Sequence, residues 1–205
     1  KGKAVCKAAL QTELGLSVDK RLPLACMITR LTDQKGLDLL LHVLSEMLNG
    51  DLQLAILGTG EAGYEAALKE HADRNAGLFA LRLAFDTELS HRMYAGADLL
   101  LMPSLFEPCG LAQMIAMRYG TVPLVRETGG LADTVRAYNP MTGEGNGFSF
   151  KNFNAHDMLY TINLARETYA NRPVWETLMT RGMREDFSWD RSAAAFLEKY
   201  TEIIG

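Results

Sequence analysis

Short apolar segments of strand length alternate with longer segments of helical periodicity through most of this chain. The apolar segments are continuous, and they occupy 24–29, 52–57, 78–83, 98–102 and 122–125. The helical segments occupy 3–14, 37–48, 64–72, 87–94 and 110–118, and another begins near residue 128. A continuous apolar strand is typical of a sheet that is covered on both faces. The alternation therefore predicts an α/β fold with a doubly wound, Rossmann-like parallel sheet.

The pattern changes toward the C-terminus. Segment 139–147 is rich in Gly, Asn and Pro, which predicts an exposed loop. Beyond Phe150 the spacing predicts helices only, over 155–169, 173–183 and 190–204. The chain begins with Lys1 rather than Met and enters a helical pattern at once. We therefore expect it to be part of a longer protein.

Composition argues against several classes of function. The net charge is −4 and the pI is about 5.6, whereas nucleic-acid-binding domains usually carry a basic excess. No apolar run approaches the ~18 residues of a membrane span, so no membrane partner is expected. Cys6, Cys26 and Cys109 lack metal-ligand spacing. We therefore expect no metal and no cofactor, and three cysteines without a disulfide framework indicate a reducing cytoplasm.

The turn Glu107-Pro-Cys-Gly110 follows the apolar segment 98–102 and precedes a helical segment. The junction between a strand and a helix N-terminus is where α/β sheets bind phosphate. A carboxylate is unexpected beside an anion, but it suits the neutral hydroxyls of a sugar. The turn therefore indicates a nucleotide-sugar site more than a plain nucleotide site.

Arg30 and Lys35 are the cations that could complete such a site. They flank the turn after the first predicted strand, at the sheet edge where ligands collect. Both can reach one diphosphate, Arg with a planar fork and Lys as a point charge. The alternative is a pair of solvated surface cations, and the spacing does not decide between them.

Glycine turns follow other predicted strands. Gly58-Thr-Gly60 lacks the third glycine of a dinucleotide fingerprint, so an ordinary tight turn is the better interpretation. Thr128-Gly129-Gly130 could cradle a phosphate or a sugar hydroxyl, or form another tight turn.

Several single residues admit two interpretations each. Phe85 could stack on a base, although a core position is the commoner fate of an aromatic residue. Cys109 has the position of an acidified thiol, but no histidine lies near it in sequence, and we prefer a packing role. Asp38, Asp98 and Asp133 are expected to be helix caps or solvated charges.

Together these segments resemble the bacterial glycogen synthases and plant starch synthases. The matching segments run in family order and are Arg30-Leu-Thr-Asp-Gln-Lys-Gly36, Leu57-Gly-Thr-Gly60, Ala95-Gly-Ala-Asp98, Pro103-Ser-Leu-Phe-Glu-Pro-Cys-Gly-Leu-Ala-Gln113, Met117-Arg-Tyr-Gly120 and Thr128-Gly-Gly-Leu-Ala-Asp-Thr-Val135. The run Phe106-Glu-Pro-Cys-Gly-Leu111 is highly specific to the family. Segment 143–148 is closer to the bacterial branch.

The resemblance implies the C-terminal, nucleotide-sugar-binding domain of a GT-B glycosyltransferase. The family moves glucose from ADP-glucose to the non-reducing end of an α-1,4-glucan, with retention at the anomeric carbon. Residues 1–186 would form the donor-binding domain, and 187–205 a helix that crosses to an N-terminal domain outside this chain. That N-terminal domain would also hold the glucan, so the chain alone is expected to be inactive.

The resemblance also implies roles for individual residues. Arg30 and Lys35 would bind the diphosphate, and Glu107 would hold glucose hydroxyls. Phe85 would stack on adenine. The remaining positions would line the sugar-phosphate pocket or lie near the phosphates, and they are Cys109, Gly110, Leu111, Thr128 and Gly129.

The sequence departs from the family at Leu105 and Ala112, where many members carry Arg and Thr. The acceptor-side Lys-x-Gly-Gly motif of the family is not in this chain. One alternative is a non-catalytic nucleotide-sugar or glucan-binding module, but such a module would not need Arg30, Lys35 and Glu107 together. Another is a different GT-B enzyme, such as a sucrose synthase or a pyridoxal-phosphate-dependent phosphorylase, although no lysine is placed to bind that cofactor.

Overall fold

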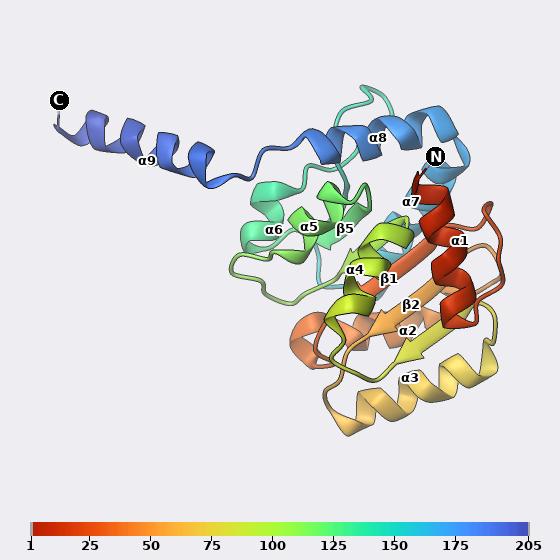
Figure 1. Cartoon of the computed structure of the whole chain (residues 1–205). Coiled ribbons are helices and arrows are strands. Elements are labelled where there is room, and N and C mark those ends of the chain that lie inside the picture. The colour runs from red at the N-terminus through yellow and green to blue at the C-terminus, as the bar shows by residue number, and fades with distance from the viewer. Residues whose placement is uncertain (1, 205) are drawn as a thin grey trace.

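The computed structural model describes residues 2–204, and one six-stranded sheet organises them (Figure 1). The strands are β1 (Leu24–Ile28), β2 (Gln53–Leu57), β3 (Phe79–Arg82), β4 (Leu99–Met102), β5 (Val122–Arg126) and β6 (Phe148–Phe150). All neighbouring pairs are parallel, in the order β3-β2-β1-β4-β5-β6. The predicted doubly wound, Rossmann-like parallel sheet is confirmed.

Helices connect the strands and cover both faces of the sheet. They are α1 (Gly2–Leu14), α2 (Leu37–Met47), α3 (Ala62–Arg74), α4 (Thr87–Gly96), α5 (Ala112–Arg118), α6 (Gly129–Thr134), α7 (Ala155–Ala170), α8 (Arg172–Arg184) and α9 (Trp189–Ile204). A short 3₁₀ helix, η1 (Asp33–Lys35), precedes α2.

Alternate residues of the central strands β1 and β4 enter two separate apolar cores, which explains why these strands are apolar throughout. Met27 and Leu101 belong to the core beneath α2, α3 and α7. Cys26 and Leu100, their neighbours in the same strands, belong to the core beneath α1 and α4. Burial on both faces therefore fixes the register of β1 against β4.

The strand β6 was not predicted from the sequence, and it pairs with β5 over Leu124–Arg126. Its last residue is Phe150, and beyond it the described residues form helices only, as predicted. The strand has only three residues, Phe148–Phe150, too few to give a periodic signal. Phe148 stacks on Trp175 of α8, with ring centroids 6.2 Å apart. Tertiary contacts therefore define this strand.

The helix α9 extends away from the rest of the domain (Figure 1). None of its described residues is buried, and Trp189 is 87% exposed. Trp189, Phe196 and Tyr200 recur at helical spacing, so they share one apolar face. No helix in residues 2–204 combines the length and apolar character needed to cross a bilayer.

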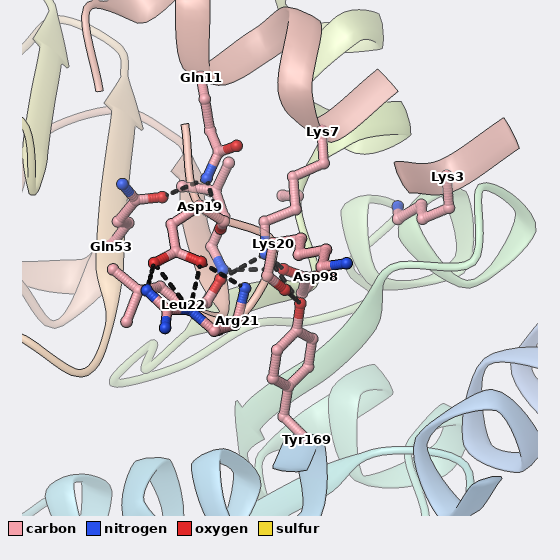
Figure 2. A network of polar contacts seen from close by, with 12 residues as sticks. Lys3, Lys7, Gln11, Asp19, Lys20, Arg21, Leu22, Gln53, Asp98 and Tyr169 are labelled. Carbon is pink, nitrogen blue, oxygen red and sulfur yellow. Dashed lines mark hydrogen bonds and ion pairs between the residues drawn. The ribbon is translucent and has the colours of Figure 1, made fainter. Parts of the chain in front are cut away.

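A buried ion pair between Lys7 and Asp98 joins α1 to the amino end of β4, beside the start of β1 (Figure 2). Lys7 Nζ lies 2.6 Å from Asp98 Oδ2 and donates a 2.8 Å hydrogen bond to the Tyr169 hydroxyl. The amide of Leu24 donates to the same Asp98 oxygen at 2.9 Å. The prediction that Asp98 is a cap or a solvated charge is therefore wrong.

We predict that Lys7→Met lowers the free energy of unfolding by about 3–5 kcal/mol, because Asp98 would be left buried without its countercharge. Urea unfolding followed by circular dichroism measures this loss. Arg74→Met is the matched control, because the Arg74–Glu70 pair is exposed and worth at most about 0.5 kcal/mol. Equal effects of the two substitutions would contradict a structural role for the buried pair.

Candidate functional site

The order of the strands reverses between β1 and β4, which lie side by side although β2 and β3 separate them in sequence. Such a switch point leaves a crevice at the carboxyl ends of the strands, where ligands bind in doubly wound sheets. The loop after β1 carries Arg30 and Lys35, and the loop after β4 carries Glu107. The topology therefore brings the predicted charged residues to one edge of the sheet.

A cavity of about 310 Å³ lies at this switch point. Lys35, Ser104, Glu107, Gly110 and Leu111 contribute to its lining. Lys35 Nζ lies 2.5 Å from Glu107 Oε2, and the two side chains are 17% and 13% exposed. Ser104 Oγ donates a 3.2 Å hydrogen bond to the same carboxylate oxygen. A cation and a carboxylate thus meet at the mouth of the crevice.

A second cavity, of about 350 Å³, adjoins the first, because Ile28 and Thr29 line both. Arg30 and Phe85 line this second cavity. Phe85 is 96% exposed, so the alternative that it belongs to the core is wrong. Arg30 is exposed and takes part in none of the ion pairs found within residues 2–204.

The turn between Glu107 and α5 is held from beneath by Gln113. This buried side chain donates from Nε2 to the carbonyl of Gly110 at 2.9 Å and to Thr134 Oγ1 at 3.1 Å. Gly110 has a φ of 72°, a left-handed conformation that favours glycine. Cys109 is exposed and lines neither cavity, and in the described chain no histidine lines them either. Nothing in this geometry supplies a base for a thiol nucleophile.

Thr128 and Gly129 also lie outside the lining of both cavities. Gly129 and Gly130 pack directly against the Glu107 turn, and the amide of Gly130 donates to the carbonyl of Pro108 at 3.2 Å. A Cβ on Gly129 would lie 2.1 Å from the carbonyl oxygen of Glu107. Close backbone packing therefore requires a small residue here, whatever else the turn binds.

Close backbone packing also explains why Gly58 and Gly60 are glycines. A Cβ at these positions would lie 1.8 Å from the carbonyl oxygen of Thr29 and 2.2 Å from that of Leu31. The loop after β2 thus packs against the loop that carries Arg30, and Gly58 also lines the second cavity.

Sequence reasoning missed the residues that hold the Glu107 turn in place, which are Gln34, Ser104, Gln113 and Arg126. Gln34 Nε2 donates to the carbonyl of Phe106 at 3.2 Å. Arg126 ends β5, so its position at the carboxyl edge of the sheet was the available signal. Ser104 and Gln113 carried no such signal, because uncharged polar residues in loops and helices are common.

A crevice with this shape can hold an extended, anionic ligand. The second cavity offers an exposed aromatic ring and Arg30, and the first cavity offers Lys35 and a carboxylate. The fold and this arrangement define the class of protein, which is the C-terminal, Rossmann-like domain of a GT-B glycosyltransferase. Residues 15–173 match the family described as "Glycosyl transferases group 1", and the chain belongs to that family.

Bacterial glycogen synthases are similar to this chain over nearly all of it. The protein from Geobacillus thermodenitrificans (strain NG80-2) is 54% identical over 202 residues, which cover 98% of this chain and 42% of the relative. The glycogen synthase of Clostridium beijerinckii is 49% identical over 203 residues. The chain thus spans 42% of the length of these curated relatives.

Among solved structures, the catalytic domain of starch synthase IV from Arabidopsis thaliana, bound to ADP and acarbose, superimposes with a TM-score of 0.88. It is 37% identical, and the match covers 98% of this chain and 43% of that one. A sucrose-phosphate synthase from Thermosynechococcus elongatus shares the fold with a TM-score of 0.70 at 19% identity, covering 96% of this chain and 49% of its own. The resemblance stated from the sequence motifs is confirmed.

We predict that two thiols react rapidly with Ellman's reagent in the folded protein and that the third reacts only after denaturation. Cys6 and Cys109 are exposed, whereas Cys26 is fully buried in β1, and burial raises its pKa to about 12. The absorbance of the released thiolate counts the reactive groups. Cys109→Ser should leave one fast thiol, and a third fast thiol in the native protein would contradict the burial of β1.

Proposed function

We propose that this chain is the donor-binding half of a retaining glucosyltransferase that transfers glucose from ADP-glucose to the non-reducing end of an α-1,4-glucan. The observation that carries the proposal is the meeting of Lys35 and Glu107, which are 72 residues apart in sequence, at the switch point of the sheet. The similarity to bacterial glycogen synthases supports the reaction, and the ADP in the starch synthase structure supports the nucleotide.

In this proposal the donor lies along the two adjoining cavities. Adenine stacks on Phe85 in the second cavity, and the diphosphate passes Arg30, which lines the same cavity. Lys35 contacts the phosphate nearest the sugar, and Glu107 accepts hydrogen bonds from glucose hydroxyls in the first cavity. Gly110 and Leu111 line the sugar-phosphate pocket, while Cys109 packs at its rim. Thr128 and Gly129 support the phosphate side from beneath the turn.

The proposed chemistry follows from where charge develops. Departure of ADP builds negative charge on the phosphate that was bonded to glucose. Two positively charged side chains that are already in position stabilise this charge without reorganisation. Lys35 is oriented in advance by Glu107, at 2.5 Å. The same carboxylate also gives the pocket its affinity for the neutral sugar.

The glucan belongs to a part of the enzyme outside this chain, because the chain spans 42% of its relatives. We propose that α9, with its exposed apolar face, contacts that part. This agrees with the expectation that residues 187–205 form a helix that crosses to an N-terminal domain. Transfer requires both substrates in one geometry, and such positioning is worth about 7–11 kcal/mol. The isolated chain should therefore bind the donor without synthesising glucan. Three free cysteines are consistent with a cytoplasmic enzyme.

Calorimetry with this chain tests the donor. We expect ADP to bind at least about tenfold more tightly than UDP, which corresponds to ~1.4 kcal/mol of better base stacking and fit. Phe85→Ala should remove most of that preference. Tyr160→Ala is the matched control, because Tyr160 is also an exposed aromatic residue but lies on α7. Equal affinity for the two nucleotides would contradict ADP-glucose as the donor.

Kinetics of the complete enzyme test the cations. Arg30→Ala and Lys35→Ala should each lower kcat about a hundredfold or more, because each removes a contact of ~2.7–4 kcal/mol to the leaving phosphate. Arg74→Ala, an exposed cation on α3, should leave kcat unchanged. Changes below threefold in both variants would mean that Arg30 and Lys35 are only solvated surface charges.

A further inference from the structure

Arg126, the last residue of β5, donates its side-chain hydrogen bonds to backbone carbonyls. Its Nε donates to Ser104 O at 2.9 Å, its Nη2 to Leu105 O, and its Nη1 to Lys151 O at 3.2 Å. It takes part in none of the ion pairs formed within residues 2–204. The guanidinium therefore ties the loops after β4 and β6 to the end of β5.

The contacts continue from Arg126 to the charged pair of the site. Ser104 makes one contact on each side of this sequence: its carbonyl accepts from Arg126, and its hydroxyl donates to Glu107. Ser104 is only 2% exposed, so its hydroxyl has little freedom to turn to water. Glu107 in turn holds Lys35 at 2.5 Å. An unbroken sequence of polar contacts thus joins β5 to the first cavity.

Apolar packing does little to hold this turn. Leu105 and Phe106, which precede Glu107, are 42% and 54% exposed. Gln34 also holds the turn, because its carbonyl accepts the amide of Leu105 at 2.9 Å. A segment with few buried apolar contacts takes its local stability from such hydrogen bonds. Arg126 and Gln34 therefore both hold the backbone of Leu105, at its carbonyl and its amide.

We propose that Arg126 is a positioning residue that fixes the Glu107 carboxylate and, through it, the Lys35 ammonium. The planar fork of a guanidinium spans the successive carbonyls of Ser104 and Leu105, which a single ammonium group does not. Arg126→Lys should therefore fail to replace it. The consequence for donor binding rests on the proposed function, in which Glu107 holds the glucose ring.

Amide hydrogen exchange in this chain tests the positioning without any ligand. Arg126→Gln and Arg126→Lys should each speed exchange at the amide of Leu105 about tenfold, because the turn loses its grip on one side. Amides in β1 should exchange at the wild-type rate. Arg181→Gln is the matched control, because Arg181 also donates to loop carbonyls, those of Gly143 and Gly145, but from α8.

Calorimetry then measures the ratio of the affinities for ADP-glucose and ADP. Glu107→Gln should lower this ratio about tenfold, Arg126→Gln should lower it similarly, and the double variant should lower it no further. An unchanged ratio in Glu107→Gln would refute the proposed role of Glu107, while hydrogen exchange would still decide the role of Arg126. Unchanged exchange at the amide of Leu105 in Arg126→Gln would overturn the positioning role. The role would also be overturned if Arg126→Gln lost affinity for ADP-glucose and ADP equally and exchanged faster throughout the domain.

Discussion

The buried ion pair between Lys7 and Asp98 is the interaction on which the arrangement of this domain depends. It joins α1 to the start of β4, and its partners Leu24 and Tyr169 bring in β1 and α7 (Figure 2). Removing two charges from water costs several kcal/mol each, so such a pair is tolerated only where hydrogen bonds satisfy both groups. Here those bonds hold β1 beside β4, the two strands whose carboxyl ends form the crevice. The buried pair therefore lies at the amino edge of the sheet, opposite the crevice.

A second pair of the same chemistry lies at the opposite edge, and its surroundings differ. Lys35 and Glu107 are 17% and 13% exposed, and they line a cavity, whereas Lys7 and Asp98 are 5% and 6% exposed and line neither cavity of the crevice. In the proposed function, the ligand replaces Glu107 as the partner of Lys35 and Lys35 as the partner of Glu107. The contrast illustrates why burial, rather than residue type, decides whether an ion pair serves the fold or a site.

The turn that carries Glu107 is built by backbone contacts more than by side-chain packing. Gln34 and Arg126 donate to its carbonyls, Gln113 donates to the carbonyls of Cys109 and Gly110, and Gly129 allows the chain beneath to approach closely. Such a turn is rigid without being covered, which leaves its exposed surface available to a ligand. This explains how a loop with exposed apolar residues can still present a carboxylate in one orientation.

The sequence by itself determined the class of fold and the edge of the sheet at which the site lies. Continuous apolar strands, such as 24–29, can be recognised from local pattern alone, and the Glu107 motif carried the family resemblance. Only the tertiary structure decided that β6 is a strand, that Asp98 is buried against Lys7, and that Arg126 supports the Glu107 turn. Each of these features depends on residues that are far apart in the chain; Lys7 and Asp98, for example, are separated by 91 positions. No local pattern encodes such contacts, because the energy of a charge or a short strand is set by the neighbours that folding brings to it.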